Sequence, residues 1–430
     1  MGTHRQRNGR TSALPLLQRW VITTTILAVA MRAQTGPQAL QDLLSEALNN
    51  NPEILAAQKR YEAARQRPAQ VSSLPDPIIS PGYTGSGRPL PGAGLGLYPT
   101  SNIGVMISQE IPFPGKRRLA GDVALREAEA QWQEYARVQL NVVSRVKQAY
   151  YRRAYAFATA GVLEKNLRLL QKLLRVTEAR YEVGKAAQQD VFKTQTQISI
   201  LVARRMQLER EERVREAEIV SLLNRISGST LPRPTELHLF PMTIKLEDLY
   251  AAARENSPLL KGQEKMVQRA ELALNLARKQ YYPDFTLNGG YYNMGGMPPM
   301  YMFRVDFKIP LYFFRKQRAE VTDHAQTLSQ FRREFEATDQ AVHYRIQDDY
   351  FMAQTSEQLV RLYGQTVMPQ ASLALESALI SYERGLVDFL TVFTNYVTVV
   401  EYEMNYYEEL ENYYLALTRL EEMTALQLIP

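Results

Sequence analysis

The chain carries one sequence pattern twice, and this repetition limits how it can fold more than any other feature. The segment Leu40–Pro52 recurs as Leu246–Pro258, with six identical positions. Three further markers return in the same order: Pro75-Asp76 as Pro283-Asp284, Ile111-Pro112 as Ile309-Pro310, and Tyr181-x-x-Gly184 as Tyr382-x-x-Gly385. A repeat of about 200 residues indicates two structurally equivalent halves, which we assign to residues 34–233 and 234–430.

The N-terminal segment, residues 1–33, has the composition of a secretory signal peptide. It contains five arginines and no acidic residue, an apolar stretch over residues 20–31, and small residues at Ala30 and Ala33. An uncleaved N-terminal anchor is the alternative, but the stretch is short and is weakened by Thr23–Thr25. The net charge of +6 belongs almost entirely to this segment, so we expect no nucleic-acid partner.

Cysteine is absent from the sequence. An exported chain of this kind has no disulfide framework and no cysteine for a lipid anchor. Beyond residues 1–33, no stretch offers the roughly 20 apolar residues of a transmembrane helix. Membrane β-strands agree with both observations, because their alternating residues give no hydropathy signal.

Two long segments have the pattern of coiled-coil helices. Residues 116–231 contain no proline, and their apolar seam with alternating spacings of four and three comprises Leu163, Leu167, Leu170, Leu174, Thr177 and Tyr181. The last segment repeats an apolar residue every seven positions, at Val392, Val399, Tyr406, Tyr413 and Leu420. Helices of about 60 residues would be about 90 Å long, which exceeds an ordinary globular domain.

Each long helical segment should turn back at its Tyr-x-x-Gly marker. Gly184 and Gly385 fit the left-handed position that follows the C-terminus of a helix. We therefore expect one long antiparallel helical hairpin in each half. Pro369 should kink the segment that leads to the second turn.

Residues between the short and the long helices alternate with a period of two, which predicts β-strands with one apolar and one polar face. The strands are predicted at residues 78–84, 103–111, 285–292 and 301–309. Loops rich in chain-breaking residues are predicted between the strands of each pair, at residues 85–99 and 293–300.

The polar strand faces suggest a water-filled interior that is lined by Glu110, Arg304, Asp306 and Lys308. Four strands leave two open edges, which lipid does not tolerate, so the chain must share its sheet with other copies. The number of strands alone does not decide whether two, three or four copies assemble. Aromatic residues near the strand ends fit a membrane-interface girdle: Tyr291, Tyr292, Tyr301, Tyr312, Phe313 and Phe314.

Taken together, these markers resemble the TolC family of outer-membrane efflux proteins over residues 36–428. The resemblance rests on the Tyr-x-x-Gly turns, on the Asn-x-Pro repeats (Asn50/Pro52 and Asn256/Pro258), and on the Ile-Pro strand ends with their following basic residues, Lys116, Arg117, Arg315 and Lys316. These four basic side chains would lie where strands meet helices, against lipid headgroups or on a plain solvated face.

The resemblance implies an α+β membrane protein with long antiparallel α-helical coiled-coil hairpins and four membrane β-strands per chain. In the family, three chains form a trimeric, twelve-stranded β-barrel in the outer membrane and an α-helical tunnel in the periplasm. The homotrimer meets a periplasmic adaptor (membrane-fusion) protein and an inner-membrane pump. The chain would then be the passive, gated channel subunit of a tripartite efflux pump.

In the family, the hairpin tips close the periplasmic entrance and receive the adaptor. A polar latch there joins an aspartate to a tyrosine and an arginine. Asp190 and Tyr382 match the aspartate and the tyrosine, whereas Val387 occupies the arginine position. Half of the latch is therefore missing, and the entrance is expected to be less tightly locked.

The family's aspartate ring at the narrowest point falls on Thr391 and Thr394, with Asp388 one turn away. Because both threonines are neutral, the entrance should also be less selective for cations. The alternative interpretation is that Asp190 and Thr391 only cap the helices that return from the tips.

No pattern indicates an enzyme, a cofactor or a metal site. The four histidines are scattered, and His4 lies in the signal segment. The predicted loop contains Met294, Met297 and Met300 and is followed by Met302. Thioethers suit Cu(I), but methionine is also an adaptable apolar filler, which is the interpretation we favour.

Export of drugs or metal ions is the first expectation for the function. Type I protein secretion is the second, because substrate choice lies mostly in the pump. A periplasmic coiled-coil scaffold without a pore is the rival from another class.

Overall fold

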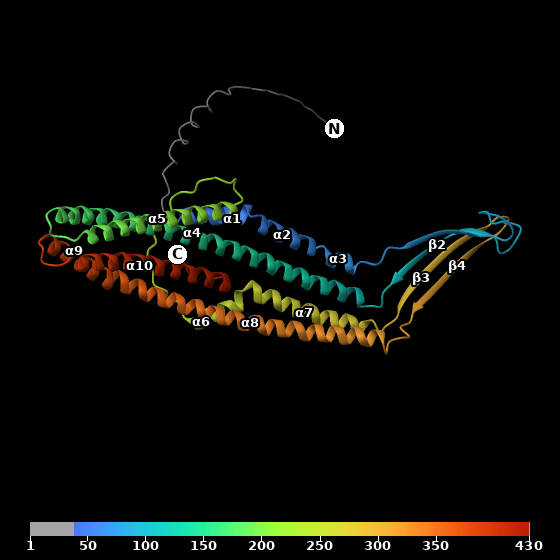
Figure 1. The fold of residues 1–430 in the computed structure, drawn as a ribbon. Coiled ribbons are helices and arrows are strands. Elements are labelled where there is room, and N and C mark those ends of the chain that lie inside the picture. Colours follow the sequence, from blue (N-terminus) through green and yellow to red (C-terminus); the bar gives the residue numbers. More distant parts are fainter. Residues whose placement is uncertain (1–37, 430) are drawn as a thin grey trace, which may run out of the picture.

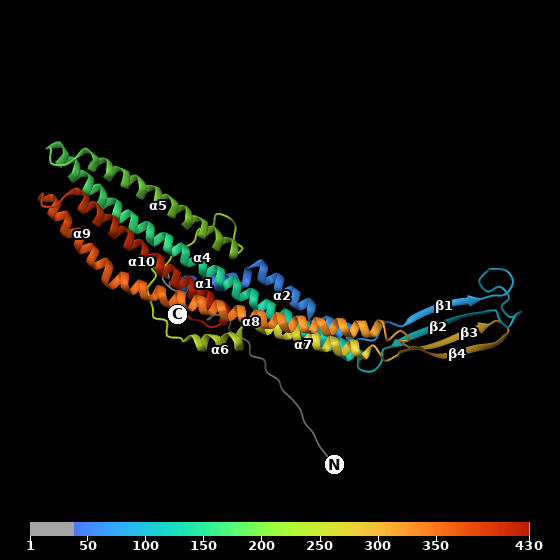
Figure 2. The ribbon, with the colours of Figure 1, turned by 60° about the horizontal axis from the view of Figure 1, so that its bottom comes forward.

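The computed structural model describes residues 38–429, so the predicted signal peptide lies outside the described residues. The described chain is mostly helical and carries one small β-sheet. Figures 1 and 2 show an elongated molecule in which the sheet projects from one end of a helical body. The tips of two helical hairpins form the opposite end.

The first half contains three short helices, two strands and two long helices. In order, they are α1 (Gln38–Asn50), α2 (Pro52–Ala64), α3 (Arg67–Ser72), β1 (Ile78–Thr84), β2 (Asn102–Ile111), α4 (Lys116–Glu182) and α5 (Gln188–Leu222). With 67 residues, α4 is about 100 Å long and runs from the sheet to the first tip (Figure 1).

The second half follows a similar order. Its elements are α6 (Leu246–Asn256), α7 (Pro258–Lys279), β3 (Asp284–Met294), β4 (Met297–Lys308), α8 (Lys316–Leu362), the π-helical turn Tyr363–Val367, α9 (Met368–Glu383) and α10 (Phe389–Thr424). The π-helical turn ends at Val367, two residues before Pro369, which has no N–H to donate to the helical hydrogen-bond ladder. The regular α-helix is thus interrupted next to this proline.

The long helices pack along apolar seams, mostly as their spacing predicts. Leu163, Leu167 and Leu170 are buried. Leu173 then takes the buried position expected of Leu174, because a straight helix turns every 3.6 residues and drifts from a seven-residue repeat. The predicted seam also ends before Tyr181, which is 44% exposed.

A charged residue, Glu403, is buried among the apolar residues of α10 that face α4. Glu403 is buried, and its carboxylate accepts hydrogen bonds from the Lys165 ammonium at 2.8 Å and from the Asn166 amide at 2.6 Å. The Tyr396 hydroxyl donates to the Asn166 carbonyl at 3.0 Å. These bonds fix α10 against α4 at a position where an apolar residue is expected.

The four strands form one antiparallel sheet in the order β1-β2-β3-β4. The predicted first strand matches β1, residue for residue. The predicted loop at residues 293–300 is wrong, because β3 and β4 continue to Met294 and Met297 and pair there. Gly295 and Gly296 alone make the turn, and Gly295 has a φ of 73°, as two-residue hairpin turns require.

Among the helices of residues 38–429, none combines the length and the apolar character that crossing a membrane requires.

Candidate functional site

The two hairpin tips are built from the same turn. Gly184 and Gly385 have φ values of 72° and 79°, the left-handed conformation predicted for both. Gly184 N–H donates to the Tyr181 carbonyl, and Gly385 N–H to the Tyr382 carbonyl, each at 2.9 Å. In the same turns, the Lys185 N–H donates to the Arg180 carbonyl and the Leu386 N–H donates to the Ser381 carbonyl, each at 2.8 Å. This is the Schellman pattern, which satisfies the last carbonyls of a helix.

Arg180 joins the two tips, and the sequence did not identify it. Its guanidinium Nη1 donates to the backbone carbonyl of Tyr382 at 2.6 Å. The same guanidinium lies 4.5 Å from the centroid of the Tyr382 ring. A cation therefore meets Tyr382, but it comes from α4 rather than from the Val387 position. The only signal in the sequence was its place directly before the Tyr-x-x-Gly marker.

Tyr382 itself is 3% exposed. Its hydroxyl has no hydrogen-bond partner among the described residues, so it is not bonded to Asp190 within one subunit. Asp190 lies half-buried in the first turn of α5. Val387 packs against the apolar core of the hairpins.

Asp388 is the residue that caps a returning helix. Its carboxylate accepts hydrogen bonds from the backbone N–H and the hydroxyl of Thr391. The hydrogen bond from the Thr391 hydroxyl, and to a smaller extent the one from its backbone N–H, lowers the pKa of the Asp388 carboxyl. The capping alternative for Asp190 and Thr391 is wrong in this form. The N-cap residue of α5 is Ala187, which has no side-chain cap, and Thr391 donates rather than accepts. Thr391 and Thr394 are exposed.

The sheet has two chemically different faces, as predicted. One face carries exposed apolar side chains, among them Ile107, Phe303 and Phe307, which are 50%, 77% and 63% exposed. The pairing register places the predicted polar residues on the other face: Glu110, Arg304, Asp306 and Lys308. There Arg304 pairs with Asp306 at 3.0 Å.

The methionines of the predicted loop lie in strands instead. Met294 ends β3, and Met297, Met300 and Met302 belong to β4. Met302 faces Gly290 on the polar side of the sheet. The Gly295-Gly296 turn leaves only two residues outside the strands, so the methionines around it belong to β3 and β4.

The junction between sheet and helices contains a buried ion pair. Lys116 Nζ lies 2.8 Å from Asp284 Oδ1 and donates to the Tyr282 carbonyl at 2.9 Å. Asp284 also accepts the N–H of Phe113 at 2.8 Å, and the rings of Phe113 and Tyr282 stack at 4.6 Å. Both interpretations offered for Lys116, lipid headgroup contact and a solvated face, are therefore wrong. Arg315 and Lys316 are exposed.

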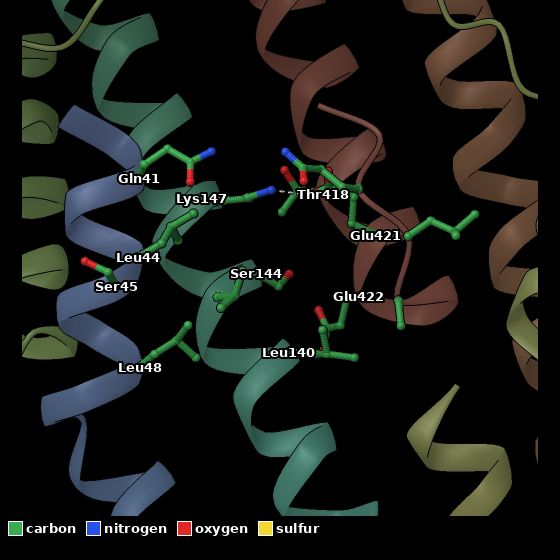
Figure 3. A pocket seen from close by; sticks show the side chains of 14 residues that line it. Gln41, Leu44, Ser45, Leu48, Leu140, Ser144, Lys147, Thr418, Glu421 and Glu422 are labelled. Carbon is green, nitrogen blue, oxygen red and sulfur yellow. Dashed lines mark hydrogen bonds and ion pairs between the residues drawn. The ribbon is translucent and has the colours of Figure 1, made fainter. Parts of the chain in front are cut away.

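A pocket of about 360 Å³ lies between α1, α4 and the end of α10. Figure 3 shows Lys147 reaching Glu421 inside it, with a distance of 2.6 Å between Nζ and Oε2. The other oxygen of Glu421 accepts the N–H groups of Leu428 and Ile429. The two charged side chains of the pocket, Lys147 and Glu421, are thus already paired. Glu421 also holds the C-terminal segment in place through the N–H groups of Leu428 and Ile429.

The family model described as "outer membrane efflux protein" matches residues 43–225 and 249–426. The chain therefore belongs to the outer membrane efflux protein family, and it is an outer-membrane protein. This family is one of efflux proteins rather than of enzymes. The resemblance found in the sequence markers is thereby confirmed.

Two curated relatives from Pseudomonas putida are similar to the chain. The probable efflux pump outer membrane protein TtgC and the antibiotic efflux pump outer membrane protein ArpC are each 24% identical over 273 residues. The match covers 61% of this chain and 54% of each relative. The chain thus spans about half the length of the curated relatives it matches.

Solved structures share the fold over a larger part of the chain. The CusC structure has a TM-score of 0.76 at 16% identity and covers 92% of this chain and 95% of its own. The outer membrane protein VceC of Vibrio cholerae has a TM-score of 0.76 at 17% identity, with 90% and 95% covered. At these identities the comparison establishes the fold.

Proposed function

We propose that the chain is the outer-membrane channel subunit of a tripartite efflux pump. One observation carries this proposal. The sheet, with one exposed apolar face and a polar opposite face, stands at the end of a helical body (Figure 2) whose helix α4 is about 100 Å long. The apolar face suits lipid, and the polar face suits an aqueous interior. The helical body is long enough to extend far into the periplasm.

The assembly that completes this channel is a homotrimer. β1 and β4 lie at the two edges of the sheet, and unpaired strand edges are not tolerated in lipid. Three copies supply twelve strands, which is the closed β-barrel that the family resemblance implies. Their long helices then form the periplasmic tunnel.

The hairpin tips form the gate at the periplasmic entrance and the contact for the adaptor. In this role Asp190 and Tyr382 belong to the latch, and Thr391 and Thr394 lie at the narrowest point. The Tyr382 hydroxyl is buried and free of partners within the described part of the subunit, so the latch requires a movement of the tips that uncovers it. Adaptor binding relaxes this closed iris.

The duct is passive and does no chemistry. The inner-membrane pump supplies the energy, and the duct carries small molecules, namely drugs or metal ions. Two relatives from Pseudomonas putida support small molecules over exported proteins by their names: the antibiotic efflux pump outer membrane protein ArpC and the toluene efflux pump outer membrane protein TtgC.

Permeation into proteoliposomes tests the proposal. Because Val387 leaves the latch incomplete, purified protein should admit a small fluorescent dye even without the adaptor, and it should retain a large labelled dextran. Phe303→Asp places a charge on the lipid-facing side and should abolish insertion. Met302→Asp is the matched control, since it lies next to Phe303 in β4 but on the polar face. Folded protein that stays soluble without detergent and admits no dye would instead support the periplasmic scaffold.

A further inference from the structure

The β3–β4 hairpin carries a group of methionines to which the proposed channel gives no role. Met294 ends β3, and Met297, Met300 and Met302 belong to β4. The turn between these strands lies at the end of the sheet that is remote from the helices (Figure 1). Methionine serves as a filler where it packs into a core. Within the described residues, none of the four belongs to an apolar core cluster, so packing does not explain the group.

A β-bulge brings these methionines to one face of the sheet. Tyr292 pairs with Met300, and Met294 pairs with Met297. Between the two pairs β3 has one residue and β4 has two, which is the count of a β-bulge. The extra residue compensates for the odd spacing of Met297 and Met300, so both lie on the same face. This is the polar face, because Met300 lies two residues from Met302.

The spacing on this face allows three thioethers to converge. Directly opposed strand residues have Cβ atoms about 4.5–5.5 Å apart, so the flexible side chains of Met294 and Met297 reach a common point. Met300 is their diagonal neighbour, at a spacing of about 7–8 Å that long side chains still bridge. Met300 is 44% exposed, and the other two are half-buried. The group is therefore open to a solute on this face.

The ring of Tyr292 forms a floor beside the thioethers. A Cβ atom on Gly290 would lie 2.7 Å from Cε2 of this ring, and one on Gly104 would lie 2.5 Å from Cδ1. Both glycines belong to the polar face. The ring thus lies over two residues that have no side chain, and its far side is turned away from the sheet. Because the face of a tyrosine ring attracts cations, this arrangement favours a positively charged ligand.

We propose that Met294, Met297 and Met300 bind a soft monovalent metal ion of the Cu(I) type at the outer end of the polar face. Thioethers are soft ligands that select Cu(I) over hard cations such as Mg²⁺ and Ca²⁺. They are also neutral, and an ion in a duct must be held weakly enough to leave again. This inference rests on the proposed channel, whose interior the polar face lines, and it makes soft metal ions part of the cargo.

Titration with Ag(I) tests the site, because Ag(I) shares the charge and the softness of Cu(I) and needs no reducing agent. The protein is kept folded in detergent, and the buffer contains no chloride. Competing ligands are few: the chain has no cysteine, and no group of three His, Asp or Glu within residues 38–429 is placed to hold a metal ion. Isothermal titration calorimetry of the wild-type protein should show saturable binding.

The triple variant with Met294→Leu, Met297→Leu and Met300→Leu should lose this binding. Leucine nearly conserves the volume of methionine, so the variant should fold, and circular dichroism checks that it does. Met206→Leu, at a position of α5 that is 60% exposed, is the matched control and should bind Ag(I) as the wild type does. Binding that persists in the triple variant would overturn the site. Folded wild-type protein without saturable binding would show that these methionines are apolar filler only.

NMR of isotope-labelled methionine methyl groups locates the ion in the wild-type protein. Ag(I) should shift the methyl signals of Met294, Met297 and Met300, because the metal binds the sulfur atom that carries each methyl group. The signal of Met206 should stay in place. Single Met→Leu variants assign the signals. Shifts of equal size at Met206 would mean that Ag(I) binds any accessible thioether, which contradicts a built site.

Dye permeation, measured on the same proteins, separates this inference from the proposed channel. A triple variant that admits the dye and still binds Ag(I) like the wild type would overturn the metal site and leave the channel intact. Wild-type protein that binds Ag(I) through these methionines but admits no dye would keep the site and overturn the channel. Dye entry in both proteins, with Ag(I) binding lost only in the triple variant, supports both.

Discussion

Arg180 contributes a cation beside Tyr382, whereas the family resemblance places the arginine of the latch at the position of Val387. Its hydrogen bond to the Tyr382 carbonyl is charge-assisted, and such bonds contribute about 1.5–3 kcal/mol. The contact ties the two tips of one subunit together, so they should move as one unit when the entrance opens.

Replacing this guanidinium should loosen the second tip. We expect Arg180→Ala to speed amide hydrogen exchange in residues 382–388, because the tie to α4 is lost and local opening becomes easier. Arg175→Ala, an exposed position on the same helix, is the control. Unchanged exchange at the second tip would mean that Arg180 does not hold it.

Glu411 on α10 makes stability depend on pH. Burial, followed by the charge of Glu211, raises its pKa to about 7, with Arg152 and Arg215 opposing and Glu408 adding to the rise. The folded chain therefore holds a proton that the unfolded chain, with an ordinary pKa of 4.5, releases. Stability should fall as the pH rises from about 4.5 to about 7 and then level off.

Glu411→Gln should remove this dependence and stabilise the protein at pH 8 by about 1–3 kcal/mol. Thermal unfolding followed by circular dichroism at several pH values measures the effect. Glu401→Gln, at an exposed position of the same helix, should leave the pH profile as it is in the wild type. An unchanged profile in Glu411→Gln would show that another group titrates.

At the scale of helices, the two halves begin their second helices differently. Asn51 caps α2, and its side chain accepts the N–H of Glu53 at 2.8 Å and donates to the Leu222 carbonyl at 2.9 Å. Ser257, at the same position before α7, makes no side-chain cap.

Asn51→Ala should therefore cost about 1–2 kcal/mol of folding free energy, whereas Ser257→Ala should cost much less. Denaturant unfolding of the two variants side by side measures the difference. Equal losses would mean that the cap bonds of Asn51 contribute little.

The elements were largely predictable because each leaves a local signal. Period-two alternation located β1 and β2, and the Tyr-x-x-Gly markers located both tips. The hairpin of β3 and β4 was predicted, but its tight turn at Gly295 was missed, because the prolines and glycines around it were interpreted as a longer loop. The environment of Lys116 was predicted wrongly, and Arg180 was missed. Their partners, Asp284 and Tyr382, are far away in the sequence, and only packing brings them together.

For the whole molecule, we propose a channel that the hairpin tips close. In this proposal the apolar sheet face lies in lipid, and the long helices form the duct. The gate depends on the tips, where Asp190 is the proposed latch residue.

Single-channel conductance in planar bilayers tests this claim most directly. Wild-type protein should give small, stable steps, and Asp190→Ala should give larger ones, because the latch is weakened. Folded protein that never inserts would contradict the channel. Steps of equal size in both proteins would contradict the latch.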